Sequence, residues 1–190
     1  MENAPTLNRV ENYLSFDLTP QHQALLSTLA LVEIIHLNAS EIVPIPEMPS
    51  AVAGVCSWQG EVLWLVDLSY WSGATPLLTS ADGLSAPSAA TDQGFQATYA
   101  STGSYCNILK VRCQGGILGL LVHQVGQLQS CDVQQIQSTK HNSAPSGLNT
   151  VEQGSLSKVR QECIKGIWTS PSGEQLPILD LDTVVQHLVQ

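Results

Sequence analysis

The sequence predicts an all-β protein with short helices, built from two small β-barrels. The nine-residue segment GEVLWLVDL (60–68) returns 113 positions later as GEQLPILDL (173–181), so the chain contains a duplication. Short apolar runs separated by Gly-containing turns fill much of the remainder, and stretches with helical periodicity are few. Such a pattern is typical of small barrels and sandwiches.

A second match supports the duplication at a different spacing. Leu31, Ile34, Leu37, Glu41, Ile42 and Ile45 align, 91 positions apart, with Val122, Val125, Leu128, Asp132, Val133 and Ile136. The offset then grows from 91 to 113, so the second copy holds about twenty more residues between its two matched blocks. Insertions of this kind fall in surface loops.

The first elements are predicted from alternation and capping. Residues 14–18 alternate apolar and polar side chains, which indicates a half-buried strand. Residues 24–37 are rich in Leu, Val and Ile, and we expect a strand that leads into a short helical turn near 29–35. Ser27 or Thr28 is the expected cap of that turn.

Proline and glycine define the next elements. The prolines of 42–49 (IVPIPEMP) require extended backbone, which we place at a sheet edge. Residues 52–55 and 61–68 are predicted as strands of a hairpin whose turn is Trp58-Gln59-Gly60. The Ser- and Ala-rich residues 72–104 are interpreted as a linker or a disordered insertion.

The second half repeats the pattern of strands and turns. Residues 106–112 and 117–122 flank Gln114-Gly115-Gly116, which is a strong hairpin signal. The polar stretch 138–157 supplies the additional loop that the two offsets require. Strands are then expected at 163–169 and 175–181, around the turn SPSG.

A final helix is predicted after the last strand. Asp182 is its expected cap, and one apolar stripe at helical spacing consists of Val184, Val185 and Leu188. The predicted organisation is one domain over 1–190, with a first barrel at about 14–71, the insert 72–104, a second barrel at about 105–181 that includes the loop 138–157, and the helix 182–190.

Composition excludes several classes of function. The net charge of −9, with only 7 Lys and Arg, leaves no basic stripe for a nucleic acid backbone. No apolar run approaches the ~20 residues of a membrane span, and the start of the chain lacks the apolar region of a signal peptide. Five cysteines without a Cys-x-x-Cys pair do not indicate a disulfide framework. We therefore expect a cytoplasmic protein without direct membrane insertion.

The repeated acids are the first candidates for catalysis. Each copy of the nonapeptide has a glutamate at its turn and an aspartate at the far end of the same strand: Glu61 with Asp67, and Glu174 with Asp180. Seven residues of strand hold such a pair ~20 Å apart, too far for shared acid and base roles. We interpret the aspartates as structural, bonded to the backbone of the turn that follows.

Histidine, cysteine and tryptophan give weaker signals. The five histidines lack metal-ligand spacing, and no cofactor or metal is expected. Cys56, Cys106 and Cys163 are interpreted as small core residues, although an enzyme with a Cys or carboxylate site remains the alternative. Trp58 fits an interface anchor as well as a core residue, whereas core packing is the preferred interpretation of the tryptophans at 64 and 168.

Several segments, taken in order, resemble the family of CheW-like chemotaxis coupling proteins. The segments are LVEI (31–34), VPIPEMP (43–49), GVCSWQGEVLWLVDL (54–68), GLLVHQV (119–125), CIKGI (163–167) and LPILDL (176–181). The resemblance covers most of the chain outside the two inserts. It implies two five-stranded SH3-like barrels related by a pseudo-two-fold axis, which agrees with the duplication.

The resemblance also implies a function and partners. Members of the family are non-enzymatic adaptors that bind the regulatory domain of a CheA-type histidine kinase and the tip of a methyl-accepting receptor. Leu31 and Glu33 match positions implicated in partner binding. Gln59 stands where the family usually has Arg, Trp58 where it has Leu and Trp64 where it has Pro, which suggests a specialised paralogue, for example of a twitching-motility or phototaxis pathway.

The expected binding residues lie on strand edges and along a hydrophobic groove between the two barrels. They are Leu31, Glu33, Ile34, Trp58 and Gln59 on the first barrel, with Val122 and Val125 as pseudo-symmetric counterparts. Gln59 cannot form the two parallel hydrogen bonds to a carboxylate that an Arg forms. A receptor contact that depends on this Arg would then be lost, so a regulator that binds the kinase without a receptor is a second alternative.

Overall fold

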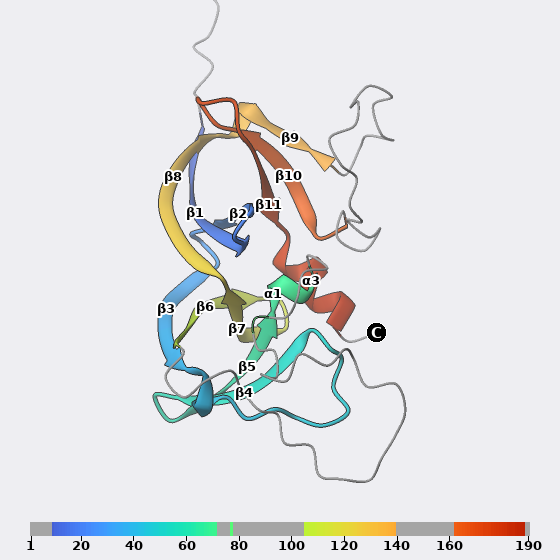
Figure 1. Cartoon of the computed structure of the whole chain (residues 1–190). Coiled ribbons are helices and arrows are strands. Elements are labelled where there is room, and N and C mark those ends of the chain that lie inside the picture. Colours follow the sequence, from blue (N-terminus) through green and yellow to red (C-terminus); the bar gives the residue numbers. More distant parts are fainter. Residues whose placement is uncertain (1–8, 72–76, 78–104, 140–161, 189–190) are drawn as a thin grey trace, which may run out of the picture.

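Two curved antiparallel-rich sheets make up the protein. The computed structural model describes residues 9–71, 77, 105–139 and 162–188 (Figure 1). The strands are β1 (Val10–Thr19), β2 (His22–Ser27), β3 (Leu31–Asn38), β4 (Val52–Trp58), β5 (Glu61–Asp67), β6 (Tyr105–Cys113), β7 (Gly116–Val122), β8 (Gln124–Asp132), β9 (Ile136–Ser138), β10 (Ile164–Thr169) and β11 (Gln175–Leu179). The α-helices in this part of the chain are α1 (Leu68–Trp71) and α3 (Leu181–Leu188). The all-β prediction with short helices is confirmed.

Each sheet takes strands from both halves of the chain. The first sheet has the order β3-β6-β7-β5-β4, and the second has the order β8-β1-β2-β11-β10-β9. The two sheets therefore do not coincide with residues 14–71 and 105–181. Instead, the leading hairpin of each half (β1-β2 and β6-β7) is part of the sheet that the other half completes.

The two sheets repeat each other strand by strand. In both, the strand of the repeated nonapeptide pairs antiparallel with its hairpin partner and parallel with an exchanged strand. Leu65 of β5 faces Gly119 of β7, and Ile178 of β11 faces Leu25 of β2. The pairs β4/β10, β5/β11, β6/β1, β7/β2 and β3/β8 are thus structural counterparts.

The structure corrects the spacing of the repeat over its first three strands. A 3-10 turn follows β3 and another follows β8, and their N-caps are Asn38 and Asp132, 94 positions apart. Their C-caps, Ile42 and Ile136, have the same spacing. The 91-position alignment is therefore three residues out of register, because it matched apolar residues without the polar caps that define the turns.

The buried apolar residues of the described chain form three clusters. One lies inside the first sheet and includes Ile35, Leu65 and Ile108, and a smaller one lies inside the second sheet around Leu25 and Trp168. The largest cluster joins residues of both sheets with the two helices: Leu14, Phe16, Ala24, Leu26, Val66, Leu68, Leu109, Val111, Leu118, Leu120, Val122, Cys163, Leu181 and Val184. Buried side chains thus join the two sheets where the sequence suggested a groove.

Several local predictions need correction. The stretch 29–35 is not a helical turn: a tight turn at Leu29 and Ala30 leads directly into β3. Its apolar run lacks a helical stripe because alternate residues face the barrel interior. Asp182 is not the cap of α3. That helix begins at Leu181, and the Asp180 side chain accepts a hydrogen bond from the Thr183 amide at 3.4 Å.

The remaining predictions differ mainly in length. The strands at 14–18 and 52–55 are longer than expected, and β8 had no strand assignment. In the Pro-rich segment, Val43 pairs with Val55 at the border of the first sheet, as an edge position requires. Residues 72–104, apart from Leu77, and 140–157 lie outside the described residues.

Candidate functional site

Glu33 occupies an unusual position on strand β3, which forms one edge of the first sheet. Ile35 and Leu37 are buried in the interior of that sheet, whereas Val32 and Ile34 are exposed on its other side. Because side chains alternate along a strand, Glu33 belongs to the inward-facing series. It is only partly buried, at the point where this series reaches the end of the barrel.

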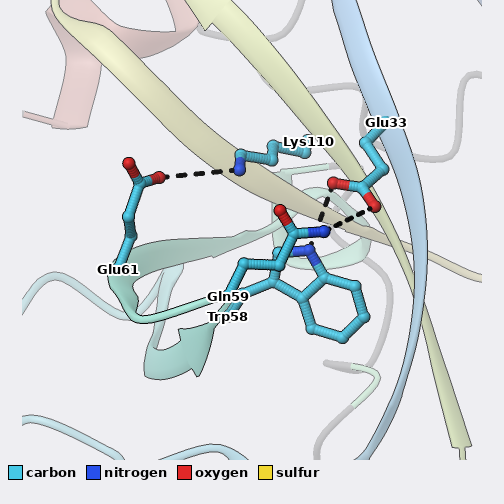
Figure 2. A network of polar contacts seen from close by, with 5 residues as sticks. All are labelled: Glu33, Trp58, Gln59, Glu61 and Lys110. Carbon is cyan, nitrogen blue, oxygen red and sulfur yellow. Dashed lines mark hydrogen bonds and ion pairs between the residues drawn. The ribbon is translucent and has the colours of Figure 1, made fainter.

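The tip of the β4-β5 hairpin reaches Glu33 from the opposite border of the sheet. Gln59 and Gly60 both have positive φ (51° and 83°), as a two-residue hairpin turn of type I′ requires. Trp58 Nε1 donates a hydrogen bond to Glu33 Oε2 at 3.1 Å, and Gln59 Nε2 donates to Oε1 at 3.3 Å (Figure 2). Both carboxylate oxygens are therefore engaged by uncharged donors.

Lys110 completes this arrangement from strand β6. It is the register partner of Glu33, and its side chain is only 9% exposed. Its Nζ lies 3.7 Å from Glu61 Oε2 (Figure 2). Glu33, Trp58, Gln59, Glu61 and Lys110, called the Glu33 cluster below, join β3, β6 and the hairpin. With two carboxylates and one ammonium group, the cluster carries one net negative charge at neutral pH.

Among the described residues, the second sheet has no equivalent of the Lys110 and Glu33 charges. The counterpart of Lys110 is Ser15, whose Oγ bonds to the amide and carbonyl of Gln127 at 2.8 and 3.0 Å. Gln127 is in turn the counterpart of Glu33. The duplicated fold thus forms in the second sheet without a lysine or a carboxylate at these two positions, so these charges of the Glu33 cluster are specific to the first sheet.

The other predicted binding residues separate into exposed and buried groups. Ile34 is 39% exposed, and Leu31 and Val125 are partly buried against the largest core cluster. Val122 is only 3% exposed, because its side chain belongs to that core. With the corrected spacing, Val125 is the counterpart of Leu31, and Leu128, which is 70% exposed, is the counterpart of Ile34.

Four of these apolar residues lie on two strands that end their sheets in the described part of the chain. β3 and β8 each lie at the border of their sheet, and Figure 1 shows them on the same side of the molecule. Ile34 pairs with Leu109 and Leu128 with Leu14, both of which belong to the core between the sheets. We call Leu31, Ile34, Val125 and Leu128 the edge surface.

The tryptophans differ from the expectation in one case. Trp168 is buried, at 3% exposure, in the second sheet, as expected for a core residue. Trp64 is 44% exposed, so its interpretation as a core residue is wrong. Leu63 and Leu65 on either side of it are buried inside the sheet, and position 64 therefore faces outward. Trp58 is partly buried and bonded to Glu33.

The repeated aspartates have structural partners. Asp67 is 2% exposed, and it accepts hydrogen bonds from the Ser69 amide, from the Ser69 hydroxyl at 2.5 Å and from the Leu77 amide at 2.7 Å. Asp180 caps α3. This confirms that these carboxylates bond to the backbone that follows the strand. Among the described residues, no three His, Cys, Asp or Glu side chains are grouped so that they could hold a metal ion.

Burial disfavours ionisation of four cysteine thiols. Desolvation raises the pKa of Cys163 to about 12 and that of Cys131 to about 11, and it also raises the pKa values of Cys56 and Cys106. Since the thiolate is the nucleophile, these four groups are poorly suited to nucleophilic catalysis at neutral pH.

The buried thiols predict a loss of stability in alkali. An unfolded thiol ionises near pH 9, while Cys163 and Cys131 stay protonated in the folded chain to about pH 12 and 11. Their contribution is therefore complete below pH 9 and is lost above it, at up to about 1.4 kcal/mol per pH unit for each thiol. Urea unfolding at pH 8 to 11 measures this slope. A Cys163→Ala variant should show a shallower slope, and an unchanged slope would contradict the assignment.

Comparison with known proteins identifies the family. A family model described as the CheW-like domain matches residues 12–189. The chain belongs to the CheW-like domain family. A solved structure described as the scaffolding protein TtCheW from Thermoanaerobacter tengcongensis is similar to it in fold, with a TM-score of 0.59 and 17% sequence identity. The match covers 92% of this chain and 91% of that one. No curated protein sequence matches significantly.

Membership in the CheW-like domain family confirms the resemblance of the sequence motifs. Within the described residues, no helix is long and apolar enough to cross a membrane. Two features of the site were not found from the sequence. Lys110 carried only one signal, a lysine inside an apolar strand (ILKV), and Leu128 was hidden by the incorrect register of the repeat.

Proposed function

We propose that this CheW-like chain is a non-enzymatic adaptor of a chemotaxis-type two-component system in the cytoplasm. It couples a CheA-type histidine kinase, through the kinase's regulatory domain, to a methyl-accepting receptor. The edge surface carries the proposal, because it places exposed aliphatic side chains at equivalent positions of both sheets. A specialised pathway such as twitching motility or phototaxis fits the substitutions at 58, 59 and 64.

The edge surface suits reversible binding of a protein. Among the described strands, β3 and β8 each have one border without a partner strand and so offer backbone donors and acceptors, and Ile34 and Leu128 offer apolar contact beside them. Interfaces of signalling complexes bury ~800 Å² on each partner, which requires contributions from more than one strand. The Glu33 cluster supports this surface, because it ties β3 to the hairpin and so fixes the strand that presents Leu31 and Ile34.

A matched pair of variants tests the edge surface. Ile34 on β3 and Ile117 on β7 are both strand isoleucines, with 39% and 41% exposure. We expect Ile34→Glu to weaken binding to the kinase regulatory domain at least tenfold in calorimetric titration, since a carboxylate would be desolvated in the interface. Ile117→Glu should leave the affinity unchanged. Equal affinities for both variants would contradict the proposal.

The second candidate is a regulator that binds the kinase without a receptor. The contact between Gln59 and Glu33 favours the regulator, because the hairpin lacks the positive charge that the usual family Arg would offer to a receptor. Titrating the wild-type chain with the kinase regulatory domain and, separately, with a receptor signalling tip distinguishes the two candidates. Binding to both supports the adaptor, and binding to the kinase alone supports the regulator.

A further inference from the structure

A second apolar surface lies on the outer face of the β4-β5 hairpin. Val43 pairs with Val55, and Val55 pairs with Trp64, so these three side chains form a row across neighbouring backbone segments. Val43 is 57% exposed and Trp64 44%. Val62, at 71% exposure, lies two residues before Trp64 on the same face of β5. We call Val43, Val55, Val62 and Trp64 the hairpin face.

The hairpin face is separate from the edge surface. Its residues come from β4, β5 and the segment beside them, whereas the edge surface comes from β3 and β8. In Figure 1 the β4-β5 hairpin lies at the end of the molecule opposite β9. Trp64 faces away from the interior that contains Leu63 and Leu65, so the Glu33 cluster and the hairpin face are on opposite sides of β5.

At two of the four positions of the hairpin face the duplicated fold has a polar residue, while the counterparts of Val55 and Trp64 are the apolar Ile167 and Pro177. The counterparts of Val43 and Val62 in the second sheet are Gln137 and Gln175, and both are exposed. The register is equivalent, since Gln137 pairs with Ile167 as Val43 pairs with Val55. Folding alone therefore tolerates glutamine in this row, and the exposed valines of the first sheet need another explanation.

The charged residues next to the hairpin face in sequence are acidic. Residues 10–109 contain no Lys or Arg. Glu41 and Glu47 flank Val43 in sequence and are exposed, whereas Glu61, which precedes Val62, is paired with Lys110 on the other side of β5. A second copy of this chain would bring the same carboxylates against each other, which opposes self-association through this face. Charge complementarity requires a partner that is apolar at its centre and basic at its rim.

We propose that the hairpin face binds a basic amphipathic helix of a partner protein, which is a contact beyond the adaptor function described above. A row across three adjacent segments spans roughly 10 Å, or about two turns of helix. A helix laid on a sheet face buries its apolar stripe, and Lys or Arg beside that stripe reach the flanking glutamates. The uncharged Trp64 side chain supplies the aromatic anchor at the centre.

Synthetic helices test this contact with the full-length chain. The probe is a fluorescein-labelled 18-residue peptide with Leu at helical spacing and Lys elsewhere, followed by fluorescence anisotropy. We expect saturable binding that weakens with added salt. The Val43→Gln, Val62→Gln double variant, which copies the second sheet, should bind at least fivefold more weakly. A Val10→Gln variant, altered at an exposed valine of β1, should bind like the wild type.

Two results would overturn the proposal: equal binding by the double variant, or equal binding of a peptide in which Glu replaces every Lys. Circular dichroism checks that the double variant is folded. The same variant should keep its affinity for the kinase regulatory domain, whereas Ile34→Glu should lose that affinity and keep the peptide. Failure of this inference is therefore distinguishable from failure of the proposed function.

Discussion

Replacement of Gly54 by alanine is expected to unfold the chain or to destabilise it by about 4 kcal/mol or more. Gly54 has φ of 137°, which L-residues rarely adopt, and an added Cβ would lie 2.3 Å from the Val43 carbonyl oxygen. Relief of that clash would break the bridge between Val43 and Val55, which closes the first sheet. Urea unfolding followed by circular dichroism measures the loss.

Gly60→Ala is the matched control for this substitution. Gly60 also has positive φ, 83°, but its added Cβ meets nothing within 4 Å. The control therefore isolates backbone strain, which costs about 1–2 kcal/mol. A Gly54→Ala variant no less stable than Gly60→Ala would show that the segment at Val43 moves aside at little cost.

Replacement of Lys110 by glutamate is the second large effect, with an expected loss of about 3–5 kcal/mol. The side chain at 110 is almost fully buried, next to Glu61 and opposite Glu33. A third carboxylate would be desolvated there without a cation in the cluster. Urea unfolding of the variant and the wild type, followed by circular dichroism, measures the loss.

Lys110→Met separates charge from packing. Methionine keeps most of the apolar stem and leaves Glu61, whose side chain is 72% exposed, in contact with water. Replacing a buried ion by an apolar group of similar size is often close to neutral. We expect a change of about 1 kcal/mol or less. A loss as large as that of Lys110→Glu would mean that the ammonium group itself holds the cluster together.

The sequence predicted the parts of this fold that depend on local patterns. The repeated nonapeptide identified β5 and β11, because both contain buried alternate residues and a structural aspartate lies at the end of β5 and directly after β11. Gly60 and the Gly115-Gly116 pair located two hairpins. The family motifs placed Leu31, Glu33 and Gln59, and the structure brings the last two into contact.

Features that depend on pairing across the chain were not predictable in this way. Exchange of the leading hairpins between sheets leaves no local signal, since each strand has the same alternation in either sheet. Apolar matching alone chose the wrong register for β8, which concealed Leu128 and selected the buried Val122 instead. Trp64 was misassigned because both faces of β5 are apolar, and composition cannot tell an exposed apolar face from a buried one.

The exchanged hairpins have a consequence for how the two copies behave as a unit. Removing the first copy would leave the second sheet without β1 and β2 and the first sheet with only β6 and β7. Removing the second copy would leave the first sheet without β6 and β7 and the second sheet with only β1 and β2. An ancestral single copy could have paired with itself as a dimer, but after this fusion neither half is expected to fold without the other. A structural change in one sheet is therefore transmitted to the other both along the polypeptide chain and through the core that the two sheets share.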